Sequence, residues 1–340
     1  MFCVTKSFFP IGQGGFFSER ISIDGEVLTF VYDCGAVTNR ANEGPSQELR
    51  DWIKKSGLKD VDFIVISHLH NDHVNGILEL DKYLKNNNSK LPKIILPKPT
   101  LTDTLLFWGK ISDDVINWYY NTETKKRFVY IDTEGNRGEH NSVDLSNITC
   151  GKTYSHDIVL QKNSWNFKFY MDKAKDDSKL TSSQKDLIRS IQTIDDYRAH
   201  ENELMLLHKQ LYKNLNESSL SMISLPADAM NNPCAKKSFV TWMNGDANLK
   251  GKRMQNIENH FSCLKGLNAD FQIPHHGSGN NLSRMPQKLK EIRAYIWAGS
   301  KNQYGHPSGS ILKIVMQSGY QCNWLMDLNV NPIIRQEYWM

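Results

Sequence analysis

The sequence predicts an α/β protein. Apolar runs rich in β-branched residues, such as 27–32 and 61–66, are typical of buried strands. They alternate with segments of helical periodicity, such as 46–56 and 77–84. Potential ligand side chains follow the 61–66 run directly, and α/β folds build their sites at the carboxyl ends of strands. We therefore expect a functional site where this strand ends.

The segment after 61–66 concentrates donor groups. His68, His70, Asp72 and His73 fall within six positions. Neutral imidazoles and carboxylates suit zinc and similar divalent ions. A single histidine would favour a plain polar surface loop, but this density does not. Four donors exceed what one tetrahedral ion would take from one tight loop, so the spacing favours two adjacent ions, an arrangement that generates hydroxide at neutral pH.

The bulk composition is that of an ordinary globular protein. The chain has 340 residues, 39% hydrophobic and 23% charged, with a net charge of +4. This length allows one large domain or two smaller ones. The six cysteines form no Cys-x-x-Cys pair, which argues against a zinc ribbon or a redox motif. Without a signal peptide or a run of about twenty apolar residues, we expect a cytoplasmic protein with no membrane partner.

The run His68-Leu69-His70-Asn71-Asp72-His73 matches the His-x-His-x-Asp-His motif of the metallo-β-lactamase fold superfamily. Val74-Asn75-Gly76-Ile77 resembles the helix start that follows that motif. The resemblance implies a four-layer αβ/βα sandwich, which we assign to residues 1–97 and 216–340. We expect the tail from Gln321 to Met340 to pack on this domain or on a partner.

Residues 98–215 have a different character. Charge rises, strand alternation weakens, and 180–215 shows the periodicity of one or two amphipathic helices. We predict a largely helical insertion here, serving as a lid or as a binding element for a protein partner. The block also contains four histidines, for which we favour surface or packing roles: His140, His156, His200 and His208.

Several further segments resemble the metallo-β-lactamase domain of ComEC-type DNA-uptake channel proteins. The matches are His275-His276-Gly277-Ser278, then Ser300, Asn302, Tyr304, Gly305, His306 and Pro307, and a corner formed by Asn216, Ser219 and Leu220. Ordinary superfamily members carry a histidine ligand near that corner, and this chain has none. Gly15 also replaces the aspartate of the Val-Gly-Gln-Gly-Asp turn found in ComEC-type domains.

The resemblance implies a role for each matched residue. Asp33, in an Asp-x-Gly motif, would brace the histidine loop, as orienting partners do at metal sites. Asp246 would bridge the two ions, although a helix cap is the alternative. We favour His275 as a ligand, with His276 outside the ligand shell or facing substrate. One ion would then have Asp72, His73, Asp246 and His275, and the other His68, His70 and Asp246, with Asn216, Ser219 or water filling the remaining position.

These assignments predict a hydrolase with two divalent ions, zinc first and manganese or magnesium as alternatives. Asp72 would belong to the catalytic centre, and His306 would either protonate a leaving oxygen or stabilise its loop. The groups expected to hold phosphate oxygens are Asn216, Ser219, Ser278, Ser300, Asn302 and Tyr304.

DNA is the expected substrate and nucleic-acid partner, because the ComEC-type resemblance implies phosphodiester hydrolysis. Basic residues follow two of the motifs, although solvated helix faces explain them equally well: Lys250, Lys252, Arg253, Arg284, Lys288, Lys290 and Arg293. A free-standing version suggests a nuclease effector in a multi-protein defence or DNA-processing system. The alternatives are a hydrolase of small esters, or a partner-binding module with a degenerate metal centre.

Overall fold

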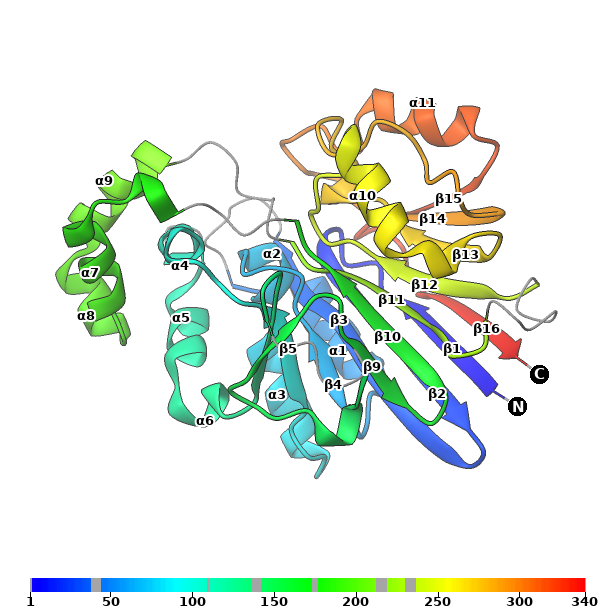
Figure 1. Cartoon of the computed structure of the whole chain (residues 1–340), viewed down its shortest axis with the longest axis horizontal. Helices are drawn as coiled ribbons and strands as arrows, with labels where there is room; N and C mark the ends of the chain where they lie inside the picture. Colours follow the sequence, from blue (N-terminus) through cyan, green and yellow to red (C-terminus); the bar gives the residue numbers. More distant parts are fainter. Residues whose placement is uncertain are drawn as a thin grey trace.

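The protein folds as two stacked β-sheets with helices on their outer faces (Figure 1). The computed structural model describes residues 2–37, 44–108, 111–135, 142–172, 177–211, 219–229 and 237–339. Within these residues each sheet has eight strands. This confirms the predicted αβ/βα sandwich.

The first sheet has the strand order β16-β1-β2-β3-β4-β5-β6-β8. Its strands are β1 (Phe2–Phe8), β2 (Gln13–Ile23), β3 (Glu26–Val37), β4 (Phe63–Val65), β5 (Lys93–Pro97), β6 (Phe128–Asp132), β8 (Thr153–Ser155) and β16 (Ile333–Trp339). Strands β3, β4, β5, β6 and β8 run parallel, whereas β16, β1, β2 and β3 pair antiparallel. The parallel half places the carboxyl ends of β3 and β4 side by side.

The second sheet has the order β15-β14-β13-β12-β11-β10-β9-β7. Its strands are β7 (Ser142–Asp144), β9 (Val159–Lys162), β10 (Trp165–Tyr170), β11 (Ser221–Pro226), β12 (Phe239–Met243), β13 (Asn268–Gln272), β14 (Glu291–Trp297) and β15 (Gln321–Leu325). Strands β12 to β15 are parallel. Because β15 and β16 both belong to the sheets, the tail packs on the domain.

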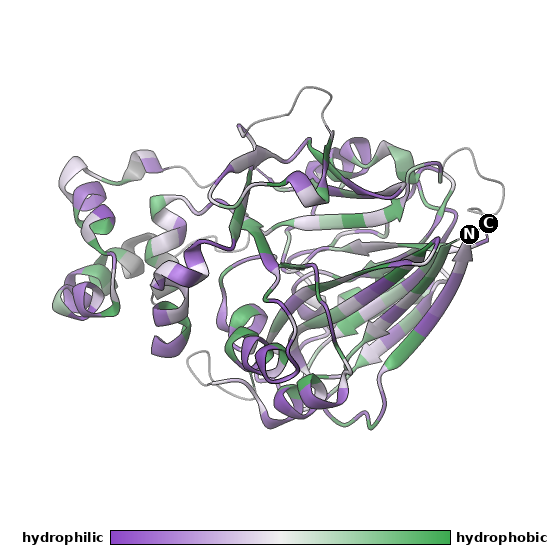
Figure 2. Ribbon diagram, turned by 90° about the horizontal axis from the view of Figure 1, so that it is seen from below, coloured by the Kyte–Doolittle hydropathy of each residue, from purple (hydrophilic) through white to green (hydrophobic). Residues whose placement is uncertain are grey.

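The helices fall into three groups in Figure 1. Next to the first sheet lie α1 (Gln47–Lys55), α2 (Asn71–Val74) and α3 (Ile77–Asn86), and next to the second lie α10 (Lys252–His260) and α11 (Gly309–Gln317). A separate group at one end comprises α4 (Leu101–Trp108), α5 (Asp113–Tyr120), α6 (Thr122–Lys125), α7 (Ser182–Ser190), α8 (Ile194–Ala199) and α9 (Glu201–Leu211). Hydrophobic and hydrophilic residues interleave along these helices (Figure 2), and none described here has the length and apolarity to cross a membrane.

The boundaries predicted for the insertion need correction. Residues 98–215 contain the helices α4 to α9, as expected, but they also contribute β6 and β8 to the first sheet. The same block supplies β7, β9 and β10 to the second sheet. The middle of the block is therefore part of the sandwich, and the helices α4 to α6 and α7 to α9 precede and follow these strands in the sequence.

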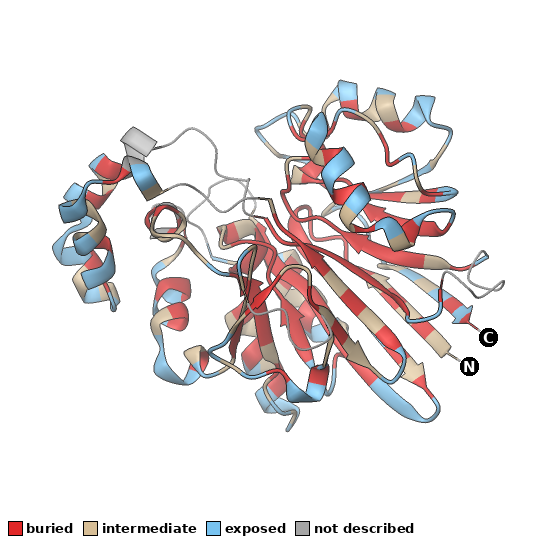
Figure 3. Ribbon diagram, viewed as in Figure 1, coloured by how far each residue is buried: buried red, intermediate tan, exposed pale blue. Residues whose placement is uncertain are grey.

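Aromatic and aliphatic side chains fill the space between the sheets, where the central strands are buried (Figure 3). Phe8 of β1 stacks on Tyr295 of β14, with ring centroids 3.7 Å apart and planes 2° apart. Phe30 and Phe63 of the first sheet both meet Phe167 of the second edge-on. Such contacts bury a large apolar area and fix how one sheet sits on the other.

Candidate metal centre

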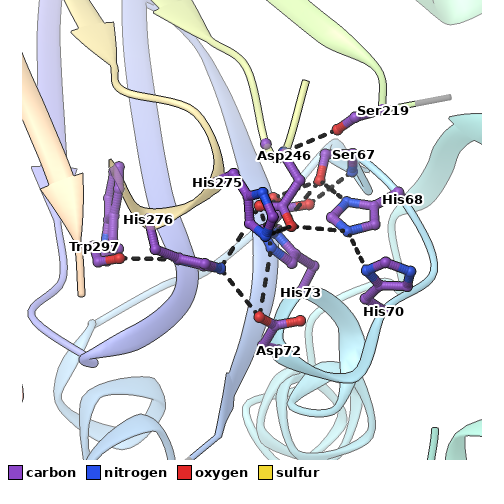
Figure 4. Close-up of polar contacts among 12 residues, drawn as sticks. Ser67, His68, His70, Asp72, His73, Ser219, Asp246, His275, His276 and Trp297 are labelled. Atoms are coloured by element: carbon purple, nitrogen blue, oxygen red, sulfur yellow. Dashed lines mark hydrogen bonds and ion pairs between the residues drawn. The ribbon is translucent and has the colours of Figure 1, made fainter. Parts of the chain in front are cut away.

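Three loops from the two sheets converge at one edge of the sandwich (Figure 4). The histidine loop follows β4, Asp246 follows β12, and the His275–His276 pair follows β13. All three strands belong to parallel regions, and parallel strands end at a common edge of their sheet. The predicted site residues are brought together although some of them, such as Asp72 and His276, are 204 residues apart along the chain.

Asp72, His73 and His276 form one group of donors. Each offers an atom within 4.8 Å of the others. His276 Nε2 lies 3.1 Å from Asp72 Oδ2, and His73 Nε2 lies 4.0 Å from the same oxygen. The sequence assigned His275 to this group and placed His276 outside it. The structure reverses that assignment, because it is the His276 ring that faces Asp72.

His68, His70 and Asp246 form a second group. His68 Nε2 lies 2.9 Å from His70 Nδ1 and 3.6 Å from Asp246 Oδ2. His275 Nε2 is also 3.6 Å from Asp246 Oδ2. His275 thus lies on the His68 side of the centre, because both rings face the same oxygen of Asp246.

Asp246 lies between the two groups, and each of its oxygens faces a different one. Oδ2 faces His68 and His275, whereas Oδ1 lies 3.1 Å from His73 Nε2 and 3.6 Å from His276 Nε2. Its side chain is only 2% exposed. This is the arrangement expected of a carboxylate shared by two adjacent cations.

The donor atoms fit divalent cations. Asp246 Oδ1 and His73 Nε2 are buried, and within the described part of the chain neither has a hydrogen-bond partner. Burial alone would raise the pKa of Asp246, but His275, His73 and the other rings hold it well below its ordinary value. Burial alone would likewise lower the pKa of His73, yet Asp246, Asp33 and Asp72 raise it well above. The carboxylates therefore stay ionised and require positive charge beside them.

Hydrogen bonds aim the Nε2 atoms of the histidines at the centre. His73 Nδ1 lies 2.8 Å from Asp33 Oδ2, and His276 Nδ1 lies 2.9 Å from the carbonyl of Trp297. His275 Nδ1 is 2.9 Å from Asn281 Oδ1. Because each of these oxygens accepts the Nδ1 proton, each Nε2 keeps its lone pair for a ligand.

Asp33 has the bracing position predicted for it. Its φ of 54° turns the backbone at this point of β3, and its side chain is fully buried. Besides His73, its carboxylate accepts the Ser67 amide at 2.7 Å and the Ser67 hydroxyl at 2.8 Å. Burial raises the pKa of Asp33, while His73 opposes the shift. Asp33 thus fixes both the first residue of the loop and the ring of His73.

Residues 23–134 match the family model described as the metallo-β-lactamase superfamily. The matched segment contains Asp33 and the whole histidine loop. The chain contains a metallo-β-lactamase superfamily domain. Proteins of this superfamily are metal-dependent hydrolases, and the fold implies binding of divalent metal, which the two donor groups suit.

Solved structures that are similar to this one include three named proteins. YhfI from Bacillus subtilis, a metallo-β-lactamase fold protein, shares 9% identity over 99% of this chain and 100% of its own, with a TM-score of 0.45. Unliganded yeast PDE1 shares 10% over 98% and 99%, with a TM-score of 0.44. A diphosphatase of the PhnP family shares 11% over 100% and 98%, with a TM-score of 0.43. These likenesses carry no information on activity, and no curated protein matches the chain.

Two side chains predicted to bind substrate form hydrogen bonds within loops of the sandwich. Ser219 is buried, accepting the Asp246 amide at 3.1 Å and donating to the Asn244 carbonyl. Asn302 donates to the carbonyls of Gly299 and His306 and accepts the His306 amide. Both side chains are fully engaged within the protein.

The remaining predicted contacts differ in accessibility. Ser278 is buried and its hydroxyl accepts the Asn280 amide, whereas Ser300 is exposed and its amide donates to Asp327. Asn216 lies outside the described residues. Of the predicted substrate contacts that the structure describes, Ser300 and Tyr304 are therefore the accessible ones.

His306 and Tyr304 border the His275 side of the centre. The rings of His306 and His275 are 5.7 Å apart, and Tyr304 stacks on His306 with its side chain 63% exposed. Burial, with some help from His276 and His275, lowers the pKa of His306 to about 4. His306 is therefore neutral at pH 7, which disfavours the predicted role as a general acid.

Glycines make room for the centre, a signal that the sequence analysis did not use. A Cβ on Gly35 would lie 2.5 Å from backbone atoms of His73, and one on Gly14 would lie 2.0 Å from the Gly35 carbonyl. A Cβ on Gly245 would lie 2.4 Å from Ser67 Cβ. Only glycine allows the loops carrying His73 and Asp246 to approach this closely.

We expect Gly245→Ala to lower kcat/KM by about 100-fold or more, since displacing a site by about 1 Å has effects of that size. Gly251→Ala is the matched control. Both glycines have positive φ, 52° and 56°, but a Cβ on Gly251 would meet nothing within 4 Å. Backbone strain should cost both variants about 1–2 kcal/mol of unfolding free energy, and Gly245→Ala should lose more because its Cβ also overlaps Ser67. Metal content and hydrolysis should fall in Gly245→Ala alone, and an equal fall in both would contradict this account.

Proposed function

We propose that this protein is a phosphodiesterase that cleaves DNA with the help of two divalent metal ions. The observation that carries the proposal is the position of Asp246. Its two oxygens face two separate groups of donors, at 3.1–3.6 Å from the nearest imidazole nitrogens. A carboxylate shared in this way, with histidines on both sides, suits a pair of ions.

Different side chains of the protein would bind each ion. Asp72, His73 and His276 would hold one ion, and His68, His70 and His275 the other, with Asp246 shared. Such ions supply a nucleophilic hydroxide at neutral pH and positive charge for an anionic transition state. Asp33 and the Trp297 carbonyl keep the rings of His73 and His276 in the required tautomer.

In this proposal His275 replaces the missing third histidine. The neighbouring residues His275 and His276 both have positive φ, 50° and 53°. This backbone turn sends the two rings to different oxygens of Asp246. A binding module with a degenerate centre is then less favoured, because the gap that suggested it is filled from another loop.

Two features support a nucleic-acid substrate. The His-His-Gly-Ser run and the loop from Ser300 to Pro307 resemble those of ComEC-type domains. The exposed ring of Tyr304, stacked on His306 beside the centre, offers an aromatic face on which a base can stack.

Tyr304→Ala should therefore weaken DNA binding without disturbing the chemistry. Base stacking on an aromatic side chain is worth about 1–3 kcal/mol, so KM for single-stranded DNA should rise by about 5- to 100-fold. The rate on methyl p-nitrophenyl phosphate, which lacks a nucleobase, and the metal content should change less than about twofold. Tyr304→Phe, which keeps the ring, is the control and should behave as the parent. Unchanged KM for DNA in Tyr304→Ala would remove this support.

A plasmid-cleavage assay with zinc, manganese or magnesium tests the proposed function. The parent is compared with the double variant Asp72→Ala, His73→Ala on plasmid, single-stranded DNA, RNA and bis-p-nitrophenyl phosphate. We expect cleavage of DNA by the parent and none by the variant. Equal cleavage by both would show that the centre is not catalytic, and activity on bis-p-nitrophenyl phosphate alone would argue against a nuclease.

The basic residues give a specific reason to keep small phosphodiesters as a second candidate. Arg253 pairs with Asp172, and Arg284 with Glu258. Arg293 is largely buried and binds Asp270 and Glu337. These three arginines already pair with carboxylates of the protein. The exposed lysines of the predicted cluster, Lys250, Lys252 and Lys290, are then left to contact a phosphate backbone. A small phosphodiester needs fewer such contacts than DNA does.

A further inference from the structure

A second set of metal-type donors lies outside the candidate metal centre. His156 and Asp157 follow β8, and His260 is the last residue of α10. Their donor atoms all lie within 4.8 Å of one another. His156 Nε2 and His260 Nδ1 are each 3.7 Å from the same oxygen, Asp157 Oδ1.

The hydrogen bonds of the two histidines determine which ring atoms carry protons. His260 Nε2 lies 2.7 Å from the carbonyl of Phe169, which can only accept, so Nε2 is protonated. His156 Nδ1 lies 3.1 Å from the carbonyl of Met171 and 3.4 Å from the Met171 amide. The carbonyl contact is the shorter, so we assign the proton to Nδ1. The lone pairs of His156 Nε2 and His260 Nδ1 are then both left on the Asp157 side.

Asp157 is held in a matching orientation. Its Oδ2 accepts the hydroxyl of the buried residue Ser155 at 3.4 Å, and its amide donates to the same hydroxyl at 3.2 Å. Oδ1 is thereby directed toward the two histidines. Burial, with help from His156, also lowers the pKa of His260, which keeps that ring neutral at pH 7.

The three donor atoms face one another, so a single cation can contact all of them. The separations of 3.7 Å are too long for hydrogen bonds. They are close to the spacing of about 3.3–3.4 Å between ligands that lie about 2.0–2.1 Å from a tetrahedral zinc ion. Each ring also donates its other nitrogen's proton to a backbone carbonyl, the usual outer partner of a metal-binding histidine.

We propose that His156, Asp157 and His260 bind an additional divalent transition-metal ion, of the zinc type, outside the candidate metal centre. Two imidazoles and one carboxylate favour zinc or a similar ion over magnesium or calcium, which prefer oxygen ligands. The side chains are 16–37% exposed, so an ion can enter and water can complete the tetrahedron. The packing or surface role predicted for His156 from the sequence is replaced by this assignment.

The position of the site indicates what the ion does. His156 follows an edge strand of the first sheet, its backbone partner Met171 follows β10 of the second, and His260 ends a helix that covers the second sheet. An ion held here cross-links the two layers of the sandwich. It should therefore add to stability without taking part in hydrolysis.

Metal stoichiometry of the full-length protein tests the proposal. After removal of metals and dialysis against zinc, Asp157→Asn and His260→Gln should each bind about one ion fewer per chain than the parent, or bind it at least 10-fold more weakly. The double variant Asp72→Ala, His73→Ala should keep this ion, so the result is independent of whether the candidate metal centre is catalytic. Cobalt bound to that double variant should show visible absorption, and Asp157→Asn, added to it, should lower that absorption by the share of one ion.

A matched control comes from His200 and Glu203, an exposed pair 4.0 Å apart. Glu203→Gln should bind zinc as the parent does, because no third donor among the described residues completes that pair. Zinc should also raise the melting temperature of the Asp72→Ala, His73→Ala variant, and Asp157→Asn, added to it, should make that rise smaller. Folded Asp157→Asn and His260→Gln proteins with the parent's zinc stoichiometry and affinity would overturn the proposal.

Discussion

Asp246→Asn is expected to lower kcat/KM on bis-p-nitrophenyl phosphate by more than about 100-fold while leaving the fold intact. Loss of an outer-shell partner costs a metal site about 10- to 100-fold, so the loss of a shared ligand should cost more. Asparagine keeps the shape of the side chain but removes the negative charge that both donor groups face. Kinetics and metal analysis on the same preparation would measure the effect.

Asp327→Asn is the control for this substitution. Asp327 also lies near the loop that borders the centre, where it accepts the amide of Ser300 at 2.8 Å. An asparagine oxygen can accept the same hydrogen bond, so hydrolysis and metal content should match the parent. If Asp246→Asn bound the parent's complement of metal and hydrolysed at the parent's rate, the shared-carboxylate arrangement would be wrong.

The histidine loop could be predicted because its signal is local. A single short loop after an apolar strand contains all four donors, His68, His70, Asp72 and His73. Bracing by Asp33 also followed from a motif, and the structure shows the contacts expected of it.

The directions in which the His275 and His276 rings point could not be predicted in the same way. It depends on the left-handed backbone at both positions, which sets the direction of each ring. The presence of a histidine in the sequence does not by itself predict that conformation. Which histidine meets Asp72 is therefore a property of the folded loop.

The extent of the insertion was misjudged for a different reason. Strands β7, β8 and β9 are three or four residues long. Such short strands carry little alternation for a pattern to detect. The His156–Asp157–His260 cluster was equally invisible, since its donors come from segments about a hundred residues apart and match no motif.

Buried charge in the sandwich was also missed. Lys6 shares the inward face of β1 with Val4 and Phe8, and the three are 0–2% exposed. A pattern of alternation predicts an apolar residue at that position. What makes the lysine tolerable is Asp270 on β13, whose carboxylate lies 2.8 Å from Lys6 Nζ. That partner is 264 residues away and emerges only when the sheets stack.

Asp270→Ala is expected to lower the free energy of unfolding by about 3–5 kcal/mol, the usual cost of removing one partner from a buried ion pair. Asp270 is fully buried, and besides Lys6 it binds Arg293 through two contacts of 2.6 and 2.7 Å. Its loss removes the carboxylate that pairs with the buried Lys6 ammonium between the sheets. Urea denaturation at pH 7 would measure the change, and a loss below about 1 kcal/mol would contradict the prediction.

The double variant Lys6→Met, Asp270→Leu separates charge from packing. Replacing both members of a buried pair with apolar residues is often close to neutral, so most of the stability lost in Asp270→Ala should return. Arg293 keeps Glu337 as its partner at 2.6 Å in that variant. If the double variant were no more stable than Asp270→Ala, the loss would come from packing and not from the stranded lysine.

The effect of Asp270→Ala should also depend on pH, with a sign that follows from the pKa of Asp270. Burial alone would raise that pKa, but Lys6 and Arg293 outweigh it and hold the pKa below the ordinary value of 3.8. The native state therefore binds fewer protons here than the unfolded chain, and the pair's contribution is complete above pH 3.8. It disappears as the pH falls through the folded pKa. The stability difference between parent and Asp270→Ala should consequently be constant from neutral pH down to about pH 5 and shrink in stronger acid.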